Sequence, residues 1–485
     1  MGYLTLPQTQ QSTSGLWVLL IASEVALAIS ILLYNYYALL LLPIFSLLAG
    51  LVLFPELAYF FFLFNIVNHI LQFQIDYAFS DPPRLWRMEG IPVDIVLVPG
   101  PIVDALILVA AVSWLLARLA GLRLPYPRTA IDLPLAVFFF WVSLSLLWAP
   151  DWLPAFIQLG MVICSYLAFY LTVTVLRTRK LFHAALWVLL ASGLANALLA
   201  IYSLQAQAFL RKIFIQENMH FLVSFLVSAK QRGAGMTYTL FTADFLNMVI
   251  MLGAGLFLAV RQFKTKVLVF ALLVIITFGS LTTLSKGGQI SLVGGLVFFI
   301  FAYKPARKYW YLFLPGLVAA LLVLLQLLPV AFPWPERAEF TRERLSFFAR
   351  SLIWENALED LIATYGLGYG VGSFYFSHNL CLDVLFNFGI IGLAIWFWLL
   401  YRLIRSLWQA VSRQAVSSPE YPLLLAAAAG LVSILIFGLI NGFYFEEKNW
   451  LLFGLCMALV NLASNPAAPL PESNLIGPKE YLIRS

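Results

Sequence analysis

The sequence has few charged residues and few cysteines for its length. Of its 485 residues, 11% are Asp, Glu, Lys or Arg and three are cysteines, whereas 62% are hydrophobic. So little charge in so apolar a chain excludes a soluble multidomain protein and indicates that the chain folds in lipid. The cysteines have no paired metal-ligand spacing, which argues against a cysteine-based metal site, and we expect Cys164, Cys381 and Cys456 to pack inside or at the edge of apolar segments.

What the chain has instead is a series of apolar runs. Each run of about twenty residues is long enough to cross a bilayer, so we predict an all-α polytopic membrane protein with about 12–14 transmembrane helices. We expect one transmembrane domain over residues 1–463 and a cytoplasmic tail over 464–485. The candidate spans lie near 16–34, 36–54, 56–73, 102–120, 131–149, 154–176, 181–204, 237–260, 267–285, 287–303, 311–330, 380–402, 423–441 and 449–463.

Short basic connectors between these spans indicate the orientation. They contain Arg177, Arg179 and Lys180; Arg261, Lys264 and Lys266; Lys304, Arg307 and Lys308; and Arg402, Arg405 and Arg413. Alternating crossings put all four connectors on one side, which the positive-inside rule makes the cytoplasm. Both termini are then cytoplasmic and segments 74–101, 205–236 and 331–377 lie outside. The net charge of +6 is assigned to this orientation, and we expect no nucleic-acid partner.

Basic residues in the outside segments need another explanation. Arg232 lies in one segment, and Arg344 and Arg350 lie in another that also carries several glutamates. Either these charges pair locally or they bind an anion. The apolar spacing from Arg344 to Ile362 predicts an amphipathic helix with Arg350 and Trp354 on one face. Interfacial anchoring and presentation of a guanidinium to a ligand would both produce that pair.

The end of this segment holds the strongest candidate for chemistry. Glycines alternate from Gly366 to Gly372, which permits tight turns and close backbone approach. Ser377-His378-Asn379 then opens an apolar span, and we expect Ser377 to cap the helix with His378 in its first turn. A helix N-terminus and partial burial both favour a neutral imidazole that accepts a proton, although a packing histidine would occupy the same place.

Polar residues continue along the same span. Asn379, Asp383 and Asn387 recur every four residues, so we expect them to face the bundle interior rather than lipid. Lys286 falls where two spans meet at the outer face, and it either snorkels to the interface or meets an anion. Together with Arg232, Arg350 and His378 it would form a positively charged site for a phosphate or pyrophosphate. No cluster at metal-ligand spacing accompanies these residues, and we expect neither a metal nor a cofactor.

These motifs resemble those of a known family, the bacterial O-antigen ligase and O-antigen polymerase superfamily of membrane glycosyltransferases. The resemblance runs from Arg350 and Trp354 through the glycines to His378-Asn379 and then Gly389-Ile-Ile-Gly392. Thr283-Leu-Ser285-Lys286-Gly287 is similar to the family's Thr-x-Ser-Arg-Gly element, with lysine in place of arginine. Residues 230–400 carry the resemblance, whereas the first 200 residues match only in hydropathy.

The resemblance implies a GT-C-like fold with a catalytic loop over 331–377 on the periplasmic side of a bacterial inner membrane. It implies a metal-independent transferase that moves a glycan from undecaprenyl pyrophosphate to a sugar hydroxyl, in surface polysaccharide or lipopolysaccharide assembly. The family's activities differ in the acceptor, which is another glycan, lipid A-core or a protein. Polymerase is favoured over ligase because the chain has more predicted spans than ligases usually have.

The resemblance also implies roles for individual residues. His378 would be the general base, and Arg232 and Arg350 would bind the pyrophosphate. Lys286, Asn379, Arg344 and Trp354 would contact substrate. A transporter or flippase of lipid-linked sugars is the alternative, because it too needs many spans and buried polar groups.

Overall fold

The structure, a computed structural model, describes residues 55–66, 73–76, 95–98, 101–119, 127–216, 239–305, 354–355, 357–359, 361–373, 377–442 and 446–464. The elements in order are α3 (Pro55–Phe64), β1 (Phe73–Asp76), β2 (Ile95–Val98), α5 (Pro101–Leu119), α6 (Asp132–Leu144), the 3-10 turn η2 (Ser145–Trp148), α7 (Trp152–Val175), α8 (Arg179–Gln216), α10 (Thr239–Ala259), α11 (Phe263–Thr282), α12 (Lys286–Ala302), α15 (Leu380–Arg413), α16 (Glu420–Asn441) and α17 (Glu447–Ser464).

The helical membrane architecture predicted from the apolar runs is present. Six of the described helices are long and apolar enough to cross a membrane, namely α7, α8, α10, α11, α15 and α16. Two more, α6 with its 3-10 turn and α12, are apolar but shorter. The predicted spans 16–34, 36–54 and 311–330 lie outside the described residues, so the total of about 12–14 helices stays a prediction.

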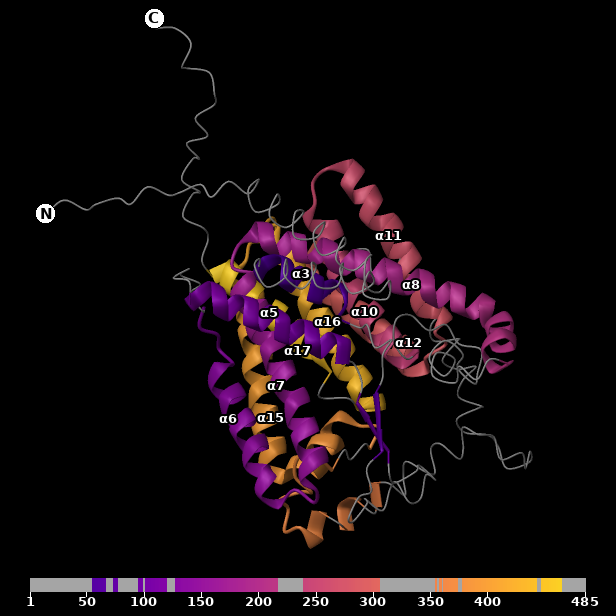
Figure 1. Ribbon diagram of the computed structural model, residues 1–485. Coiled ribbons are helices and arrows are strands. Elements are labelled where there is room, and N and C mark those ends of the chain that lie inside the picture. The colour runs from indigo at the N-terminus through magenta and orange to yellow at the C-terminus, as the bar shows by residue number, and fades with distance from the viewer. Residues whose placement is uncertain are drawn as a thin grey trace, which may run out of the picture.

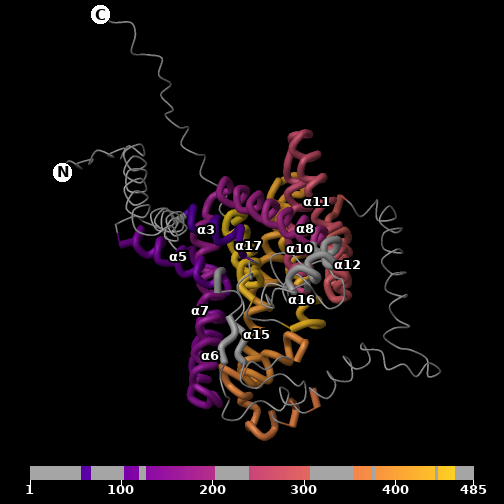
Figure 2. The backbone as a smooth tube through the Cα atoms, turned by 45° about the vertical axis from the view of Figure 1, so that its right-hand side comes forward, coloured from indigo at the N-terminus to yellow at the C-terminus, as the bar shows by residue number. Residues whose placement is uncertain are grey.

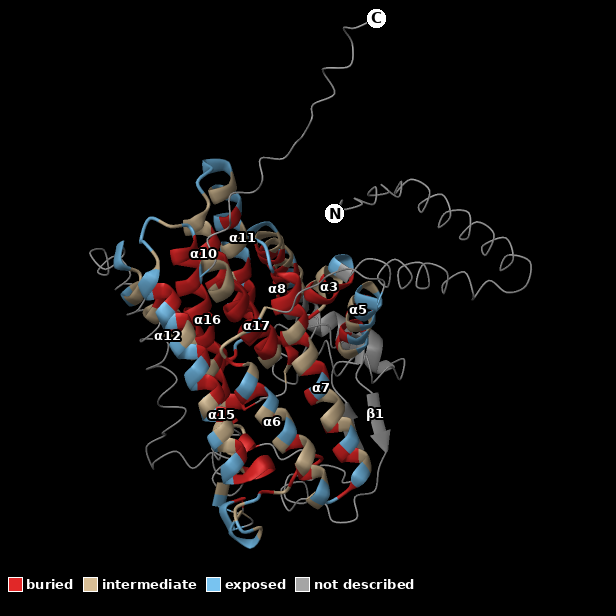
Figure 3. Ribbon diagram, turned by 90° about the vertical axis from the view of Figure 1, so that its left-hand side faces the viewer, coloured by how far each residue is buried: buried red, intermediate tan, exposed pale blue. Residues whose placement is uncertain are grey.

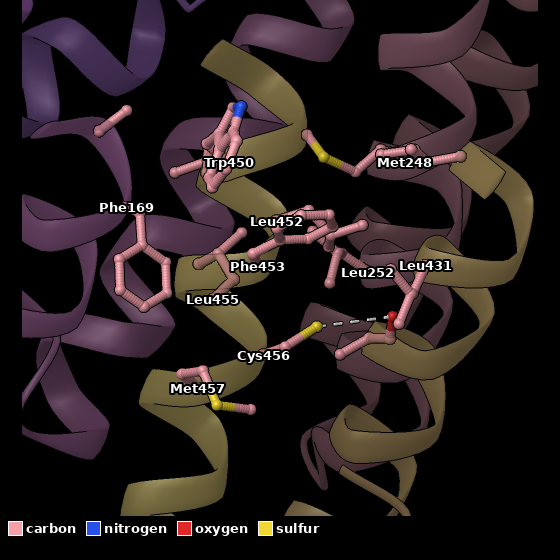
Figure 4. Packing of buried hydrophobic residues seen from close by; sticks show 14 of the residues in the cluster. Phe169, Met248, Leu252, Leu431, Trp450, Leu452, Phe453, Leu455, Cys456 and Met457 are labelled. Atoms are coloured by element: carbon pink, nitrogen blue, oxygen red, sulfur yellow. Dashed lines mark hydrogen bonds between the residues drawn. The ribbon is translucent and has the colours of Figure 1, made fainter. Parts of the chain in front are cut away.

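The centre of the bundle is α17, which is surrounded by other helices (Figures 1 and 2). Every residue from Glu447 to Leu459 is buried. Helix α17 lies between Phe169 of α7 on one side and Met248 of α10 and Leu431 of α16 on the other, and the Cys456 thiol lies 3.9 Å from the carbonyl oxygen of Ala427 (Figure 4). The rings of Trp450 and Phe453 contact Trp396 of α15, at centroid distances of 5.8 and 6.1 Å. Buried residues concentrate in α10, α16 and α17, whereas α5, α6 and α11 carry exposed faces (Figure 3). Exposed apolar side chains on these outer helices are those that lipid would cover.

Several predicted boundaries are wrong. The predicted span 56–73 is interrupted, because α3 ends at Phe64 and residues 73–76 form strand β1. Strand β1 pairs antiparallel with β2, and this short ribbon, at the start and near the end of the predicted outside segment, is the only β-structure among the described residues. Helix α8 continues to Gln216, past the expected end at 204, and α15 continues to Arg413, past 402. Hydropathy ends a span where polar or charged residues begin, whereas an amphipathic helix continues through them.

The described residues of the four basic connectors lie at one end of the bundle, around the start of α16, whereas Arg307 and Lys308 lie outside the described residues. Arg179 forms an ion pair with Glu420, Nε to Oε1 at 2.9 Å, and the ring of Tyr303, which precedes Lys304, lies 6.0 Å from the ring of Tyr421. Helix α10 approaches the same turn, since a Cβ built on Gly255 would lie 3.0 Å from the carbonyl oxygen of Pro422. Alternating crossings require this clustering. The side of the membrane that this end faces, and the position of the termini, stay predictions.

Candidate functional site

His378 occupies a tightly held turn immediately before α15. Its φ is 60°, a left-handed conformation in which histidine is among the better tolerated residues. On one side, Ser377 is fully buried and donates to Asp383 Oδ1 from its backbone N (2.5 Å) and its hydroxyl (2.7 Å). The carbonyl oxygen of Ser377 accepts a hydrogen bond from Trp354 Nε1 at 2.8 Å. The backbone on either side of the imidazole is therefore fixed by contacts from other parts of the site.

The helix cap differs from the expectation. Asn379, not Ser377, is the N-cap of α15, since its Oδ1 accepts from the backbone N of Cys381 (3.0 Å) and of Leu382 (3.2 Å). His378 accordingly precedes the cap instead of lying in the first turn. Both side chains can cap a helix, but Asp383 already engages the Ser377 hydroxyl, which leaves Asn379 to do so.

The polar stripe along α15 lies inside the bundle, as predicted, for two of its three members. Asp383 is 1% exposed and Asn387 is fully buried. Asn387 Nδ2 donates to the carbonyl oxygen of Asp383 at 2.7 Å, and its Oδ1 accepts from the hydroxyl of Ser373. Asn379 is instead partly exposed at the helix end.

The alternating glycines pack against a break in α15. Gly366, Gly368, Gly370 and Gly372 all have positive φ, and so does Gly389, at 71°, where α15 kinks. The loop runs alongside the break: Tyr369 N donates to Phe386 O and Gly370 N donates to Asn387 O, each at 2.8 Å. Because the loop takes up carbonyls that the kink releases, the predicted close backbone approach is confirmed, and its partner is a helix of the same chain.

Lys286 begins α12, directly after the short turn that follows α11. The N-cap is Ser285, whose Oγ accepts the backbone N–H of Gly288 at 3.1 Å. Asn247, fully buried on α10, hydrogen-bonds to residues on both sides of this turn. Its Nδ2 donates to Gly288 O (2.7 Å), and its Oδ1 accepts from the Ser280 hydroxyl (2.8 Å). Lys286 is partly exposed and therefore borders the surface.

The end of α16 connects these two turns. Asn379 Nδ2 donates to the carbonyl oxygen of Leu439 at 3.0 Å. Two residues further on, Asn441 lies against the first turn of α12, where a Cβ built on Gly287 would be 2.3 Å from Asn441 Nδ2. The structure thus brings the His378 turn and the Lys286 turn to the same end of the bundle, opposite the basic connectors. We call this end the site end and define it by Lys286, His378, Asn379 and Asn441.

A buried charge cluster, which sequence reasoning missed, lies beside the site end. Lys448 Nζ is 3.1 Å from Asp244 Oδ2 and also pairs with Glu446, and Lys448 and Asp244 are 3% and 1% exposed. Burial raises the pKa of the Glu446 carboxyl to about 7, because Lys448 only partly offsets the desolvation and the nearby Asp244 also repels a second charge. The sequence contains one indication of buried charge, since Asp244 lies within an apolar run and Lys448 lies at the edge of another.

The other predicted site residues are only partly accounted for. Arg232, Arg344 and Arg350 lie outside the described residues, so their proximity to His378 stays a prediction. Trp354 donates to the carbonyl oxygen of Ser377, and its contact with substrate stays a prediction. The predicted amphipathic helix can be followed only from Trp354 onward, where Leu358 and Ile362 are 50% and 77% exposed, while Ala357 packs against Phe386. Within the described part of the chain, no group of three or more His, Cys, Asp or Glu side chains could hold a metal ion.

These features define a class: a helical protein of the polytopic membrane type, in which the turn before the interrupted helix α15 and the turn between α11 and α12 lie at one end of the bundle. Neither protein-family models nor curated protein sequences give a match to this chain.

Proposed function

We propose that this protein is a membrane glycosyltransferase of the O-antigen polymerase and ligase type. It would transfer a glycan from undecaprenyl pyrophosphate to a sugar hydroxyl at the periplasmic face of a bacterial inner membrane, with polymerase favoured over ligase. The observation that carries the proposal is the junction at the end of α16, where Leu439 and Asn441 contact the His378 turn and the Lys286 turn respectively. A candidate base and a candidate phosphate-binding cation thus occupy the same end of the bundle.

The transfer reaction would use the side chains of His378, Lys286, Arg232 and Arg350. The His378 imidazole takes the proton of the acceptor hydroxyl while the hydroxyl oxygen bonds to the anomeric carbon. The bond from that carbon to the pyrophosphate oxygen breaks, and undecaprenyl pyrophosphate leaves with the electron pair. Lys286, with Arg232 and Arg350 from the other segments, would stabilise the charge that develops on the leaving group. Asn379 and Trp354 fix the backbone around the base, while Arg344 stays a predicted substrate contact.

The rigidity of the His378 turn supports this proposal. A base must be held within hydrogen-bond reach of the hydroxyl that it deprotonates, and a turn fixed by Asp383, Trp354 and Asn379 provides such preorganisation. A lone packing histidine would not require three surrounding side chains to define its backbone conformation.

A second candidate function is transport of a lipid-linked sugar across the membrane. The observation that favours it is the break in α15 at Gly389 with Asp383 and Asn387 buried beside it, since broken helices with interior polar groups are common in transporters. The two candidates differ in whether a glycosidic bond is made.

The experiment is a reaction with purified protein, an undecaprenyl-pyrophosphate oligosaccharide and an acceptor. The transferase proposal expects free undecaprenyl pyrophosphate and a lengthened or glycosylated acceptor, with a second lipid-linked repeat and lipid A-core tested separately to distinguish polymerase from ligase. Activity should persist in a chelator. Movement of the intact lipid-linked sugar across proteoliposomes without bond formation would replace this proposal with transport.

A further inference from the structure

We propose that Asn441 is a further phosphate-binding residue: its side-chain amide, Lys286 and the first turn of α12 together form a subsite for one phosphate of a lipid-linked pyrophosphate. This inference rests on the proposed function and deepens it, because it assigns a residue of α16 to the recognition of the donor. Asn441 lies in a part of the chain to which no role was assigned from its sequence.

The first observation is a buried donor with no acceptor. Asn441 is 4% exposed, and its Nδ2 has no hydrogen-bond partner among the described residues. A buried unsatisfied donor costs about 1–3 kcal/mol, so such groups persist where a ligand or water completes them. The direction of the amide is defined by Gly287: only the absence of a Cβ there allows Nδ2 to approach the helix so closely.

The second observation is the position of the Asn441 amide. This amide lies against the first turn of α12, a helix of 17 residues, whose N-terminal N–H groups carry partial positive charge. Helix N-termini of this kind bind phosphate groups when further donors converge on them. Lys286 supplies a full positive charge in the same turn, so a cation from α12 and an amide donor from α16 lie together there.

The third consideration is the chemistry of lysine. A lysine ammonium is a compact point charge and lacks the planar pair of N–H donors with which arginine binds two phosphate oxygens. A primary amide offers two N–H donors in one plane. Asn441 therefore provides, from the neighbouring helix, the planar donors that Lys286 does not have.

A purely structural role for Asn441 makes different predictions. If the amide were turned by 180°, Oδ1 would face the first turn of α12 and could accept the N–H of Gly287 as a helix cap. Loss of a cap would lower stability, but it would not change which ligands bind, and restoring donors elsewhere would not reverse it.

The experiment measures binding of undecaprenyl pyrophosphate and of inorganic pyrophosphate to the purified full chain by thermophoresis. Asn441→Leu is expected to weaken the lipid ligand about tenfold or more, as loss of hydrogen bonds to a charged group does. Adding Lys286→Arg to Asn441→Leu is expected to restore most of that affinity, because the guanidinium brings its own planar donors. Ser433→Ala, which removes another buried unpaired polar atom two turns earlier on α16, is the matched control and should bind as wild type does.

Two results would overturn the subsite: Asn441→Leu binding the lipid as tightly as wild type, or a weakened variant that Lys286→Arg fails to restore. Dependence on Asn441 for inorganic pyrophosphate but not for the lipid would also overturn it, since the donor would then bind elsewhere. If Asn441→Leu does not fold, Asn441→Asp replaces it: a carboxylate suits the helix N-terminus but repels phosphate, so wild-type affinity there would refute the subsite.

The outcome for the subsite can be separated from that of the proposed function. Binding that depends on Asn441 in a protein that transfers no glycan would keep the subsite and refute the transferase. Transfer of glycan by a protein in which Asn441→Leu binds the donor normally would keep the transferase and refute the subsite.

Discussion

The backbone N–H of Ile390 donates to the carbonyl oxygen of Gly366 at 3.0 Å, so the glycine loop replaces a helical hydrogen bond across the break in α15. The break divides α15 into a short segment that follows the His378 turn and a longer segment after Gly389. Gly389 makes this geometry possible, because its φ is 71° and a Cβ there would lie 2.2 Å from Gly366 O.

Gly389→Ala is therefore expected to destabilise the protein by at least about 2 kcal/mol, through both steric overlap and the left-handed backbone. The measurement is the thermal unfolding midpoint in detergent. Gly160→Ala on α7 is the control, because nothing lies within 4 Å of the added Cβ, and it should be neutral or slightly stabilising. Equal midpoints for Gly389→Ala and wild type would show that the loop and the break are not coupled in this way.

Asp383 is expected to act as a positioning residue for His378. Asp383→Ala removes the acceptor of two hydrogen bonds from Ser377, which should cost about 1–3 kcal/mol and loosen the turn. Steady-state kinetics should then show a fall in kcat with little change in KM, and Asp383→Asn should recover part of the rate.

A suitable control for this effect is Asp132→Ala. Asp132 also accepts a hydrogen bond from a backbone N–H, that of Thr129 at 2.8 Å, but it belongs to the start of α6. If Asp132→Ala reduced kcat as much as Asp383→Ala, the effect would be one of general stability.

Lys448 is expected to be essential for stability. Lys448→Met would leave Asp244 and Glu446 facing each other in the core without a cation, at a cost of about 3–5 kcal/mol. Neutralising both carboxylates in the same variant, with Asp244→Asn and Glu446→Gln, should restore most of the loss. Thermal melting of the single and triple variants checks this, and a triple variant no more stable than Lys448→Met would argue against the ion pairs as the cause.

Glu446 is expected to make stability depend on pH. Its pKa rises from an ordinary value of 4.5 to about 7 in the folded protein, so the folded state holds the proton more tightly than the unfolded state. The stabilisation of the folded state by this protonated carboxyl is fully present below about pH 4.5 and is lost as pH rises through 7. It amounts to a free energy of unfolding on the order of 3 kcal/mol in total. Melting curves between pH 4.5 and 8 should show that Glu446→Gln flattens this dependence, and an unchanged slope would contradict it.

Much of the fold follows from the length of the apolar runs. Helices α7, α10 and α16 lie within a few residues of their predicted spans, because burial and membrane crossing both require continuous apolar sequence. The continuation of α8 and α15 into charged sequence was not predicted, since hydropathy does not distinguish an amphipathic helical turn from a connector.

The site was predictable as a set of residue types but not as a geometry. The polar stripe of Asp383 and Asn387 follows from helical periodicity alone. Which residue caps α15 depends on the contact of Ser377 with Asp383, which spacing does not reveal. The buried pair of Lys448 with Asp244 joins two distant parts of the chain, and one sequence contains no signal that pairs them.

The central claim is that His378 deprotonates the acceptor, and the most direct measurement is release of undecaprenyl pyrophosphate by His378→Ala. His183→Ala is the control, since His183 lies at the start of α8 with Nδ1 2.8 Å from the carbonyl oxygen of Arg179, at the opposite end of the bundle. We expect His378→Ala to lower kcat by about 10²–10⁴-fold, with an unchanged melting midpoint, and His183→Ala to retain full activity. Turnover by His378→Ala at the wild-type rate would contradict the account.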